Sequence, residues 1–523
     1  MPGLTHYYSQ ILGHDLTAIR YIDEDFVGAK LDNGGSYHFA YGDPVIPLAS
    51  PAGQQLVRIV GGTFNGLVAR CKAPLPLRND PVLHFSMVDV QQGDGMVIQT
   101  PGGRIILIDG GDNQLFARHL AARFAGTESD KRLLIDGMIV THGDADHFDG
   151  LVEIRRSEEI TNTPAEPNRK RKRLFIEVDR VFHNGLAKRP EERADGSKRK
   201  DVEMFGATVP ATPTTADETF CVDLIDDLLT QILDGDLNRP FRNWRAALAH
   251  WNGHHPITMT SVNQNQAQAI KNLFEQEAGF GVDVHGPIAK IVANKAQLLF
   301  LRAAKKAAEM HLSDAPAVTS SFSASHTVNG HSITFRLRFK NVRFLLTGDL
   351  NQQAMARLRA ALPAADFECE ILKAPHHGSH DFDFQMLKQA KPVLSLVSSG
   401  DESEQHEHIH PRATLLSALG RVSRGSTGII FITELAAFFK QRGVSKELDP
   451  EAKKPGSKFD PAAPFFAFER TNFGIVHIRT DGKRVLAFTH SGEAGVNEGY
   501  AFDVATDHDV TFRPSLAIRT APQ

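Results

Sequence analysis

The sequence predicts a layered α/β domain with a metal site at one edge of its sheets. After residue 84, apolar runs of strand length are interspersed with stretches of helical periodicity. Three of these runs end in glycine-containing loops that carry histidine or aspartate, at His142, Asp349 and His376. Strands that run the same way place their ends at one edge of a sheet, so we expect the three loops to meet.

The composition is typical of a soluble globular protein. The 523 residues are 41% hydrophobic and 23% charged, and the length suffices for two or three domains. The formal net charge of −4 excludes a global attraction to nucleic acid, so such binding has to come from a local patch. No apolar run reaches the roughly 18 residues that a membrane span requires.

Cysteine usage and the first residues favour a reducing, cytoplasmic setting. Cys71, Cys221 and Cys369 are far apart in the sequence and form no CxxC pair. Neither a disulfide framework nor a thiolate zinc site is therefore expected. The first residues lack a basic start and a long apolar stretch, so we expect no secretory signal.

Residues 1–77 are predicted to form a small β module of barrel type. Short strand-like runs are separated by Gly, Asn and Asp turns, of which Asp32–Gly35 is a good hairpin signal. Nothing in this stretch has catalytic character. We expect the module to contribute stability or, alternatively, to dock a protein partner.

A β-meander is predicted at the start of the main domain. Strands at 84–90, 96–100 and 104–108 are joined by two glycine turns, and the last strand runs into the acidic loop Asp109–Asp112. A glycine-rich loop of this kind can approach a metal ion or a phosphate closely. An amphipathic helix is expected to follow it.

The densest group of metal-ligand residues is Thr141-His142-Gly143-Asp144-Ala145-Asp146-His147. It follows the apolar run 135–140, which is typical of a short buried strand. Imidazole nitrogens and carboxylate oxygens bind borderline and hard divalent cations. Two histidines and two aspartates on one loop beside a buried strand favour a metal site over a solvated polar loop.

Residues 156–320 are predicted to be a largely helical insertion. Helical periodicity occurs at 216–234, 240–251, 263–278 and 288–312. A strand at 178–182 ends at His183. The insertion also contains five consecutive basic residues, namely Arg169, Lys170, Arg171, Lys172 and Arg173. Such a run is typical of a solvated loop, or of a salt-sensitive contact to the phosphates of a nucleic acid.

Strand signals return after residue 320. The run 342–346 precedes Asp349, and the run 369–374 precedes His376 and His377. A later polar loop contains histidines at 406, 408 and 410, interpreted either as solvated or, best for His410, as part of the site. The main domain is predicted to span 78–500, and residues 501–523 to form a C-terminal tail.

Five segments share the order of motifs found in one known fold. They are MVDVQQGDGMVIQTPGGRIILIDGGD (87–112), THGDADHFDG (141–150), NGHSITFRLRFKNVRFLLTGDL (329–350), ILKAPHHGSH (371–380) and HIHP (408–411). Together they resemble the metallo-β-lactamase fold and, within it, the soluble domain of the ComEC-type competence DNA-uptake proteins. The resemblance does not cover the N-terminal module or the predicted insertion.

The resemblance implies an αββα sandwich with metal ions at one edge. It also implies metal-dependent hydrolysis, usually of phosphodiesters, with two bound divalent cations. The implied metal ligands are His142, Asp144, Asp146, His147, Asp349 as a bridging carboxylate, and His377. In addition, it places His376 or His410 near the substrate and Asp109 behind the ligands.

The sequence departs from the family pattern at three points. Asp144 stands where the fold usually has histidine, although the competence branch shares the aspartate, and this carboxylate shifts the expected metal from zinc toward manganese. The mid-domain ligand has no clear match, and His183 is the one residue that we would name for it. Competence proteins have membrane spans, whereas none is predicted in this chain, so it cannot be a DNA-import channel by itself.

The predicted function is that of a phosphodiesterase or nuclease. In this hypothesis a metal-bound hydroxide attacks phosphorus, Asp146 or Asp349 orients it, and His376 or His410 protonates the leaving group. An alternative is a metallohydrolase of a small molecule such as a cyclic nucleotide, lactone or thioester. A third is a metal-bound interaction module without hydrolytic activity. The sequence leaves open whether DNA, RNA or a nucleotide is the substrate.

Overall fold

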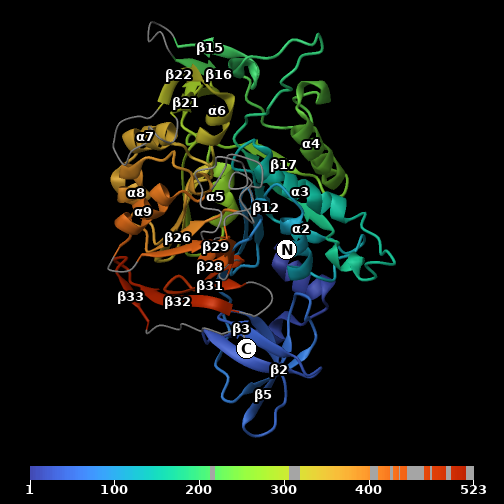
Figure 1. Cartoon of the computed structure of the whole chain (residues 1–523). Helices are drawn as coiled ribbons and strands as arrows, with labels where there is room; N and C mark the ends of the chain where they lie inside the picture. Colours follow the sequence, from blue (N-terminus) through green and yellow to red (C-terminus); the bar gives the residue numbers. More distant parts are fainter. Residues whose placement is uncertain are drawn as a thin grey trace.

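Two β-sheets that face each other form the centre of the molecule, and helices cover the outer side of each sheet (Figure 1). The computed structural model describes residues 1–211, 218–305, 318–400, 410–424, 428–434, 436–444, 464–470, 474–490 and 496–513. The polar loop after β26 (Leu394–Val397) contains three histidines. Positions 406 and 408 lie outside the described residues, and His410 lies within them.

The first sheet has ten strands in the order β17-β14-β12-β10-β9-β8-β30-β31-β32-β33. In this order they span Thr258–Ser261, Arg180–His183, Gly137–Ile139, Ile105–Asp109, Gly95–Gln99, Leu83–Met87, Ile475–Thr480, Arg484–His490, Val496–Val504 and Val510–Phe512. Strands β10, β12, β14 and β17 run parallel to one another. The helices α2 (Leu115–Arg123), α3 (Ala145–Ser157) and α4 (Arg239–Asn252) pack on its outer face.

The second sheet has six strands in the order β18-β23-β24-β25-β26-β27. They span Phe280–Gly286, Thr334–Phe339, Val342–Leu346, Ile371–Lys373, Leu394–Val397 and Ile429–Ile432. Strands β24 to β27 are parallel. The helices α7 (Gln352–Ala361), α8 (Phe384–Ala390) and α9 (Ala413–Val422) cover its outer face, on the left of Figure 1.

Alternation along the strands builds the layers between sheets and helices. In β10, Ile106 and Ile108 point into the core between the two sheets, whereas Ile105 and Leu107 point toward α2 and α3. In β24, Phe344 joins the inter-sheet core. Each such side chain contributes about 1.5–3 kcal/mol through burial. The parallel strands in both sheets are apolar on both faces because helices and a second sheet cover them.

The N-terminal module is a seven-stranded open sheet, and the predicted barrel is not confirmed. Its order is β3-β2-β6-β5-β4-β1-β7. These strands span Ser36–Ala40, Phe26–Leu31, Val68–Lys72, Gln54–Ile59, Pro44–Pro47, Arg20–Ile22 and Leu77–Arg78. Within the described residues no pairing joins the edge strands β3 and β7, and β7 has two residues, too few to close a barrel along β3.

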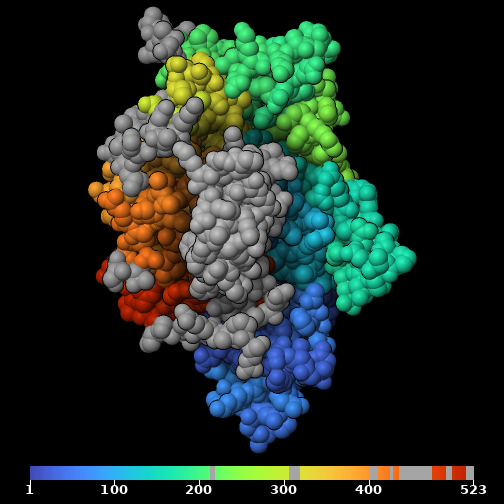
Figure 2. All heavy atoms as spheres, in the orientation of Figure 1, coloured from blue at the N-terminus to red at the C-terminus, as the bar shows by residue number. Residues whose placement is uncertain are grey.

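The module forms the lower lobe in Figure 1 and Figure 2 and packs on the first sheet. The rings of Phe26 and Phe488 meet edge to face, with centroids 5.3 Å apart. The Tyr41 hydroxyl donates to Asp481 at 3.0 Å, and Arg484 pairs with Asp25. These contacts combine apolar burial with charged pairs and fix the module to the main domain.

The prediction of a largely helical insertion at 156–320 is wrong. Strands β14 and β17 belong to the first sheet and β18 to the second. A four-stranded sheet is formed by β15 (Thr208–Pro210), β16 (Thr219–Cys221), β20 (Lys295–Leu299) and β19 (Ala289–Val292). Helix α4 lies where a helix was expected, and α5 (Gln268–Phe274) is shorter than predicted.

The stretch predicted as a helix at 288–312 shows why. Its described part forms β19, β20 and β21 (Arg302–Ala304), and β21 pairs with β22 (Val318–Phe322). Ala293 and Asn294 adopt positive φ angles of 48° and 63°, which turn the chain back between β19 and β20. Pairing with β16 then outweighs the helix propensity of Ala and Lys.

The remaining elements complete the chain. They are α1 (Gly3–His6), α6 (Ala324–Gly330), the strand pair β11 (Leu133–Ile135) and β13 (Ile176–Val178), and the pair β28 (Ala436–Val444) and β29 (Pro464–Arg470). Residues expected to start a C-terminal tail at 501 lie instead in β32 and β33 of the first sheet. Across the described residues, no helix combines the length and apolarity needed to cross a membrane.

Candidate metal centre

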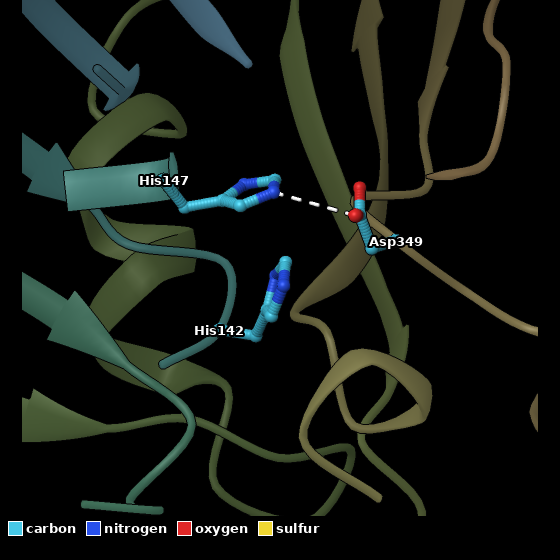
Figure 3. A group of neighbouring side chains, drawn as sticks. All are labelled: His142, His147 and Asp349. Carbon is cyan, nitrogen blue, oxygen red and sulfur yellow. Dashed lines mark ion pairs between the residues drawn. The ribbon is translucent and has the colours of Figure 1, made fainter. Parts of the chain in front are cut away.

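Three loops from both sheets meet at one edge of the sandwich. The loop after β12 carries His142 and leads into α3 with His147, the loop after β24 carries Asp349, and the loop after β25 carries His376 and His377. Figure 3 shows His142 and His147 reaching from the first sheet toward Asp349 on the second. The site therefore depends on how the two sheets face each other.

Three side-chain atoms form a closed triangle. His147 Nε2 lies 3.3 Å from His377 Nε2 and 3.4 Å from Asp349 Oδ2, and the latter two atoms are 2.9 Å apart. Asp146 Oδ2 lies 3.8 Å from His377 Nε2. A tetrahedral ion with ligand distances of about 2.0–2.1 Å places its ligand atoms roughly 3.3 Å from one another. The residues present thus fit a divalent cation at this point.

His142 extends this group on one side. One donor atom each of His142, His147 and Asp349 lie within 4.8 Å of one another, so Asp349 faces both sides. The Nδ1 atom of His142 lies 3.1 Å from Thr141 Oγ1 and 3.4 Å from Ser332 Oγ. Asp144 does not join the described groups of metal-ligand atoms, and its Oδ1 lies 3.7 Å from Lys188 Nζ.

A buried carboxylate holds His147 in position from behind. Asp109 Oδ2 is 2.9 Å from His147 Nδ1 and accepts the Thr141 hydroxyl, while Asp109 Oδ1 accepts the Thr141 backbone N–H. The proton on Nδ1 leaves Nε2 as the atom that faces Asp349. This carboxylate–histidine arrangement orients imidazoles at metal sites generally.

His377, on the second sheet, is held in a similar way by Asp94, which precedes β9 of the first sheet, and by Lys373 of β25. Neither Asp94 nor Lys373 was predicted from the sequence. Asp94 Oδ1 lies 3.3 Å from His377 Nδ1, and Asp94 pairs through its other oxygen with Lys373. The Lys373 ammonium also donates to the Gly348 carbonyl at 2.9 Å. Both Asp94 and Lys373 are fully buried. The available signals were an aspartate in a tight glycine turn and a lysine in an apolar strand.

Three residues at or beside the centre have a strained backbone. Asp109, His376 and His377 have positive φ angles of 56°, 46° and 50°, a region that side chains other than glycine rarely adopt. Gly93 sits so close to the Asp146 backbone that a Cβ would lie 1.8 Å from the Asp146 carbonyl oxygen. The turn that contains Asp94 therefore packs directly under the Asp146 loop.

The electrostatics of the centre attract cations. Burial alone would lower the pKa of His377, but Asp349 and Asp94 outweigh burial and raise that pKa to about 9. Burial is likewise outweighed at His147, where Asp349 and Asp109 hold the pKa well above its usual value. At His142, burial and the neighbouring His147 lower the pKa. A divalent cation would take the place of the protons that His147 and His377 attract.

His376 and His410 lie at the rim of the centre. His376 Nε2 is 3.8 Å from Asp349 Oδ2, and the ring centroids of His376 and His410 are 5.9 Å apart. Burial lowers the pKa of His376 to about 4 and that of His410 to about 3. Both imidazoles are therefore neutral at pH 7, so the proton-donor role predicted for them is not supplied by a pre-formed imidazolium.

His183 lines the same pocket as His142 but does not join the described groups of metal-ligand atoms. The Gly185 N–H donates to His183 Nδ1 at 3.1 Å, and His183 Nε2 lies 3.0 Å from the Asp226 carbonyl. Both ring nitrogens are thus engaged with the backbone. These contacts argue against the ligand role considered for His183.

The basic run lies on the flank of the molecule. Residues Arg169–Lys172 form a short 3-10 helix that packs near α2, in the teal segment at the right of Figure 1. Arg169 and Lys172 pair with Glu166, and Arg173 stacks on Phe175 at 4.6 Å. Lys170 and Arg171 have no ion-pair partner within the described part of the chain.

Comparison with known proteins bears on the first sheet. Residues 88–227 match the model of the metallo-beta-lactamase superfamily, and this span includes Asp94, Asp109 and the loop from His142 to His147. No curated protein matches the chain. The match is to the superfamily as a whole and does not reach Asp349 or His377. Residues 88–227 therefore form a metallo-beta-lactamase superfamily domain, and members of that superfamily are generally hydrolases that bind divalent metal ions.

Proposed function

We propose that this protein is a metal-dependent phosphodiesterase that cleaves nucleic acids. The observation that carries the proposal is the convergence of Asp146, His147, Asp349 and His377 on one point at the edge of the sandwich. Two carboxylates and two imidazoles suit zinc or manganese, and each further carboxylate shifts the preference toward the harder ion. A bound divalent cation polarises a phosphoryl oxygen and acidifies water.

The residues around this point have separable tasks in the proposal. Asp109 and Asp94 contact the Nδ1 atoms of His147 and His377, which would leave both Nε2 atoms to hold a bound cation. Asp146 orients the attacking water. A neutral His376 donates an N–H hydrogen bond toward the leaving oxygen, and His142 with Asp349 supplies ligands for a second cation.

Two exposed basic side chains suit a polymeric substrate. Lys170 and Arg171 extend from the flank of the domain and are free to contact backbone phosphates away from the centre. Such contacts add affinity for a long polyanion and none for a small ester. They therefore favour a nucleic acid over a small-molecule substrate.

A hydrolysis assay tests the proposal. Metal-depleted protein is given Mn²⁺ or Zn²⁺ and single-stranded DNA, duplex DNA, RNA or bis(p-nitrophenyl) phosphate, beside the Asp146→Ala variant. We expect wild-type protein to cut at least one polymer and the variant to be inactive with its fold intact by circular dichroism. Full activity of Asp146→Ala would overturn the site assignment, and cleavage of the small ester alone would replace the nuclease by a small-molecule hydrolase.

A further inference from the structure

Asp144 differs from the other carboxylates of the metal-ligand motif because both its oxygens are engaged elsewhere. Its Oδ1 lies 3.7 Å from the Lys188 ammonium. Its Oδ2 accepts a hydrogen bond of 2.8 Å from the side-chain amide of Asn329, when that amide is oriented to satisfy both of its ends. Asp146, two residues further in the first turn of α3, instead faces His147 and His377.

Lys188 is held above the motif by a rigid backbone. The chain leaves β14 at His183, and the Asn184 side chain then donates to the His331 carbonyl at 3.0 Å and accepts from the Leu186 N–H at 3.0 Å. The Lys188 carbonyl accepts from the Asn238 N–H at 2.9 Å, at the start of α4. The ammonium is therefore presented to Asp144 by a fixed segment rather than by a free loop.

The two sides of the centre are consequently unequal. On one side, Asp146, His147 and His377 lie together with Asp349, and Asp146 has no lysine or arginine partner among the described residues. The Lys373 ammonium lies 3.7 Å from Asp349 Oδ1, but Asp349 is common to both sides. On the other side, His142 and Asp349 lie together, and Asp144, two residues after His142, already has a lysine partner. The Lys188 and Asp144 side chains are 24% and 21% exposed, so their attraction is only partly screened by water.

We propose that Lys188 competes with a second divalent cation for Asp144, so that the centre binds one metal ion tightly and a second weakly. A second ion has to displace the ammonium from Asp144 and also bears its repulsion. The concentration of free metal then decides whether one or two ions are present. This inference deepens the metal dependence of the proposed function, and it concerns metal binding rather than cleavage.

Metal titration of the full-length protein tests the inference directly. Binding of Mn²⁺ to metal-depleted protein is followed by calorimetry and by metal analysis after equilibrium dialysis. We expect wild type to bind one ion tightly and a second only at higher free Mn²⁺. In Lys188→Met, which keeps the length of the side chain and removes its charge, the second affinity is expected to rise roughly fivefold to tenfold. Asn329→Ala should act in the same direction more weakly.

Two control variants separate this effect from a general change in charge. Lys172→Met removes a partly exposed lysine whose partner is Glu166, at 3.3 Å, and should leave both affinities unchanged. Lys188→Arg keeps the charge and should keep the second affinity low. Two equal affinities in wild type, or a Lys188→Met isotherm that superimposes on that of wild type, overturns the inference. Normal metal binding without phosphodiester cleavage would refute the proposed function and leave this inference standing.

Discussion

Strand β25 has a buried charge at each end, and the two are satisfied to different degrees. Before the strand, the Glu370 carboxylate accepts hydrogen bonds from Arg343 at 2.7 and 3.1 Å and from Arg424 at 2.7 Å. At the end of the strand, Lys373 pairs with Asp94, while the neighbouring Asp349 Oδ1 lies 3.7 Å from the Lys373 ammonium and accepts no hydrogen bond from any described residue. A buried charge with a complete set of partners serves the fold, whereas a buried carboxylate with an open lone pair is prepared for a cation.

The largest effect on turnover is expected from a change at Asp349. Asp349→Asn removes the charge that faces His147 and His377 while keeping the shape of the side chain. Because bound metal supplies several kcal/mol of transition-state stabilisation, turnover should fall by about a thousandfold or more. Hydrolysis rates and metal content of the purified variant measure this. Wild-type rates with full metal content would contradict the assignment of Asp349.

A change at Glu370 should instead lower stability and leave metal binding unchanged. Glu370→Gln leaves Arg343 and Arg424 with an uncompensated charge, so the free energy of unfolding should fall by about 3 kcal/mol. Metal affinity should not change, because Glu370 lies at the other end of β25. Denaturant unfolding and metal titration are compared on the same preparation. Weakened metal binding in this variant would show that the two ends are not independent.

Asp94→Asn tests whether the arrangement behind His377 matters for metal binding. Loss of the carboxylate removes the charge that fixes the His377 Nδ1 proton, and such partners typically contribute 10–100-fold to metal affinity. Competition with a metal indicator measures the change at the tighter position. A matched control is Asp283→Asn, since Asp283 pairs with Arg336 on the second sheet away from the centre. Equal metal affinity in both variants would show that Asp94 does not contribute to metal binding.

The metal-free centre should respond to pH in a defined direction. Because the folded pKa of His377 is raised to about 9, the proton on His377 stabilises the metal-free fold fully below about pH 6.5 and loses this effect as pH rises through 9. Metal affinity should increase as pH rises, by up to about tenfold per pH unit for each proton that metal binding releases. Thermal unfolding of metal-depleted protein and calorimetry from pH 6.5 to 9 measure both trends. A pH-independent metal affinity would contradict them.

The smallest effect is expected at the basic run. Lys170→Ala with Arg171→Ala should lower the slope of log Kd for single-stranded DNA against log salt by about one. Hydrolysis of bis(p-nitrophenyl) phosphate should not change, since among the described residues no ion pair joins these side chains to the metal-ligand residues. Fluorescence anisotropy at several salt concentrations measures the slope. An unchanged slope would assign the run to solvation alone.

The sequence predicted the parts of the site that are local in the chain. His142, Asp146 and His147 lie within six residues on the loop after β12 and the first turn of α3. Asp349 and His377 follow strands of their own, so each was visible from its neighbours. Asp94 and Lys373 were not, because a single aspartate in a turn and a single lysine in a strand acquire a role only where the two sheets meet. Asp144 shows the converse, since the motif alone cannot reveal the Lys188 partner.

The fold was predicted best where hydrophobic periodicity and turn signals agreed. The meander of β8, β9 and β10 and the strands β24 and β25 lie close to their expected positions. The Ala- and Lys-rich stretch after residue 288 was misread, because pairing with β16 outweighs local propensity. Whether the N-terminal sheet closes into a barrel depends on the length of β7, which no local sequence pattern specifies.

The most direct test of metal-dependent cleavage is the activity of metal-depleted protein as Mn²⁺ is added. Cleavage of single-stranded DNA and of bis(p-nitrophenyl) phosphate is followed while the bound metal is measured in the same samples. We expect no cleavage without metal and a rise in activity as the position formed by Asp146, His147, Asp349 and His377 fills. Saturation of that position without hydrolysis of any phosphodiester, or cleavage that persists in excess chelator, would contradict this expectation.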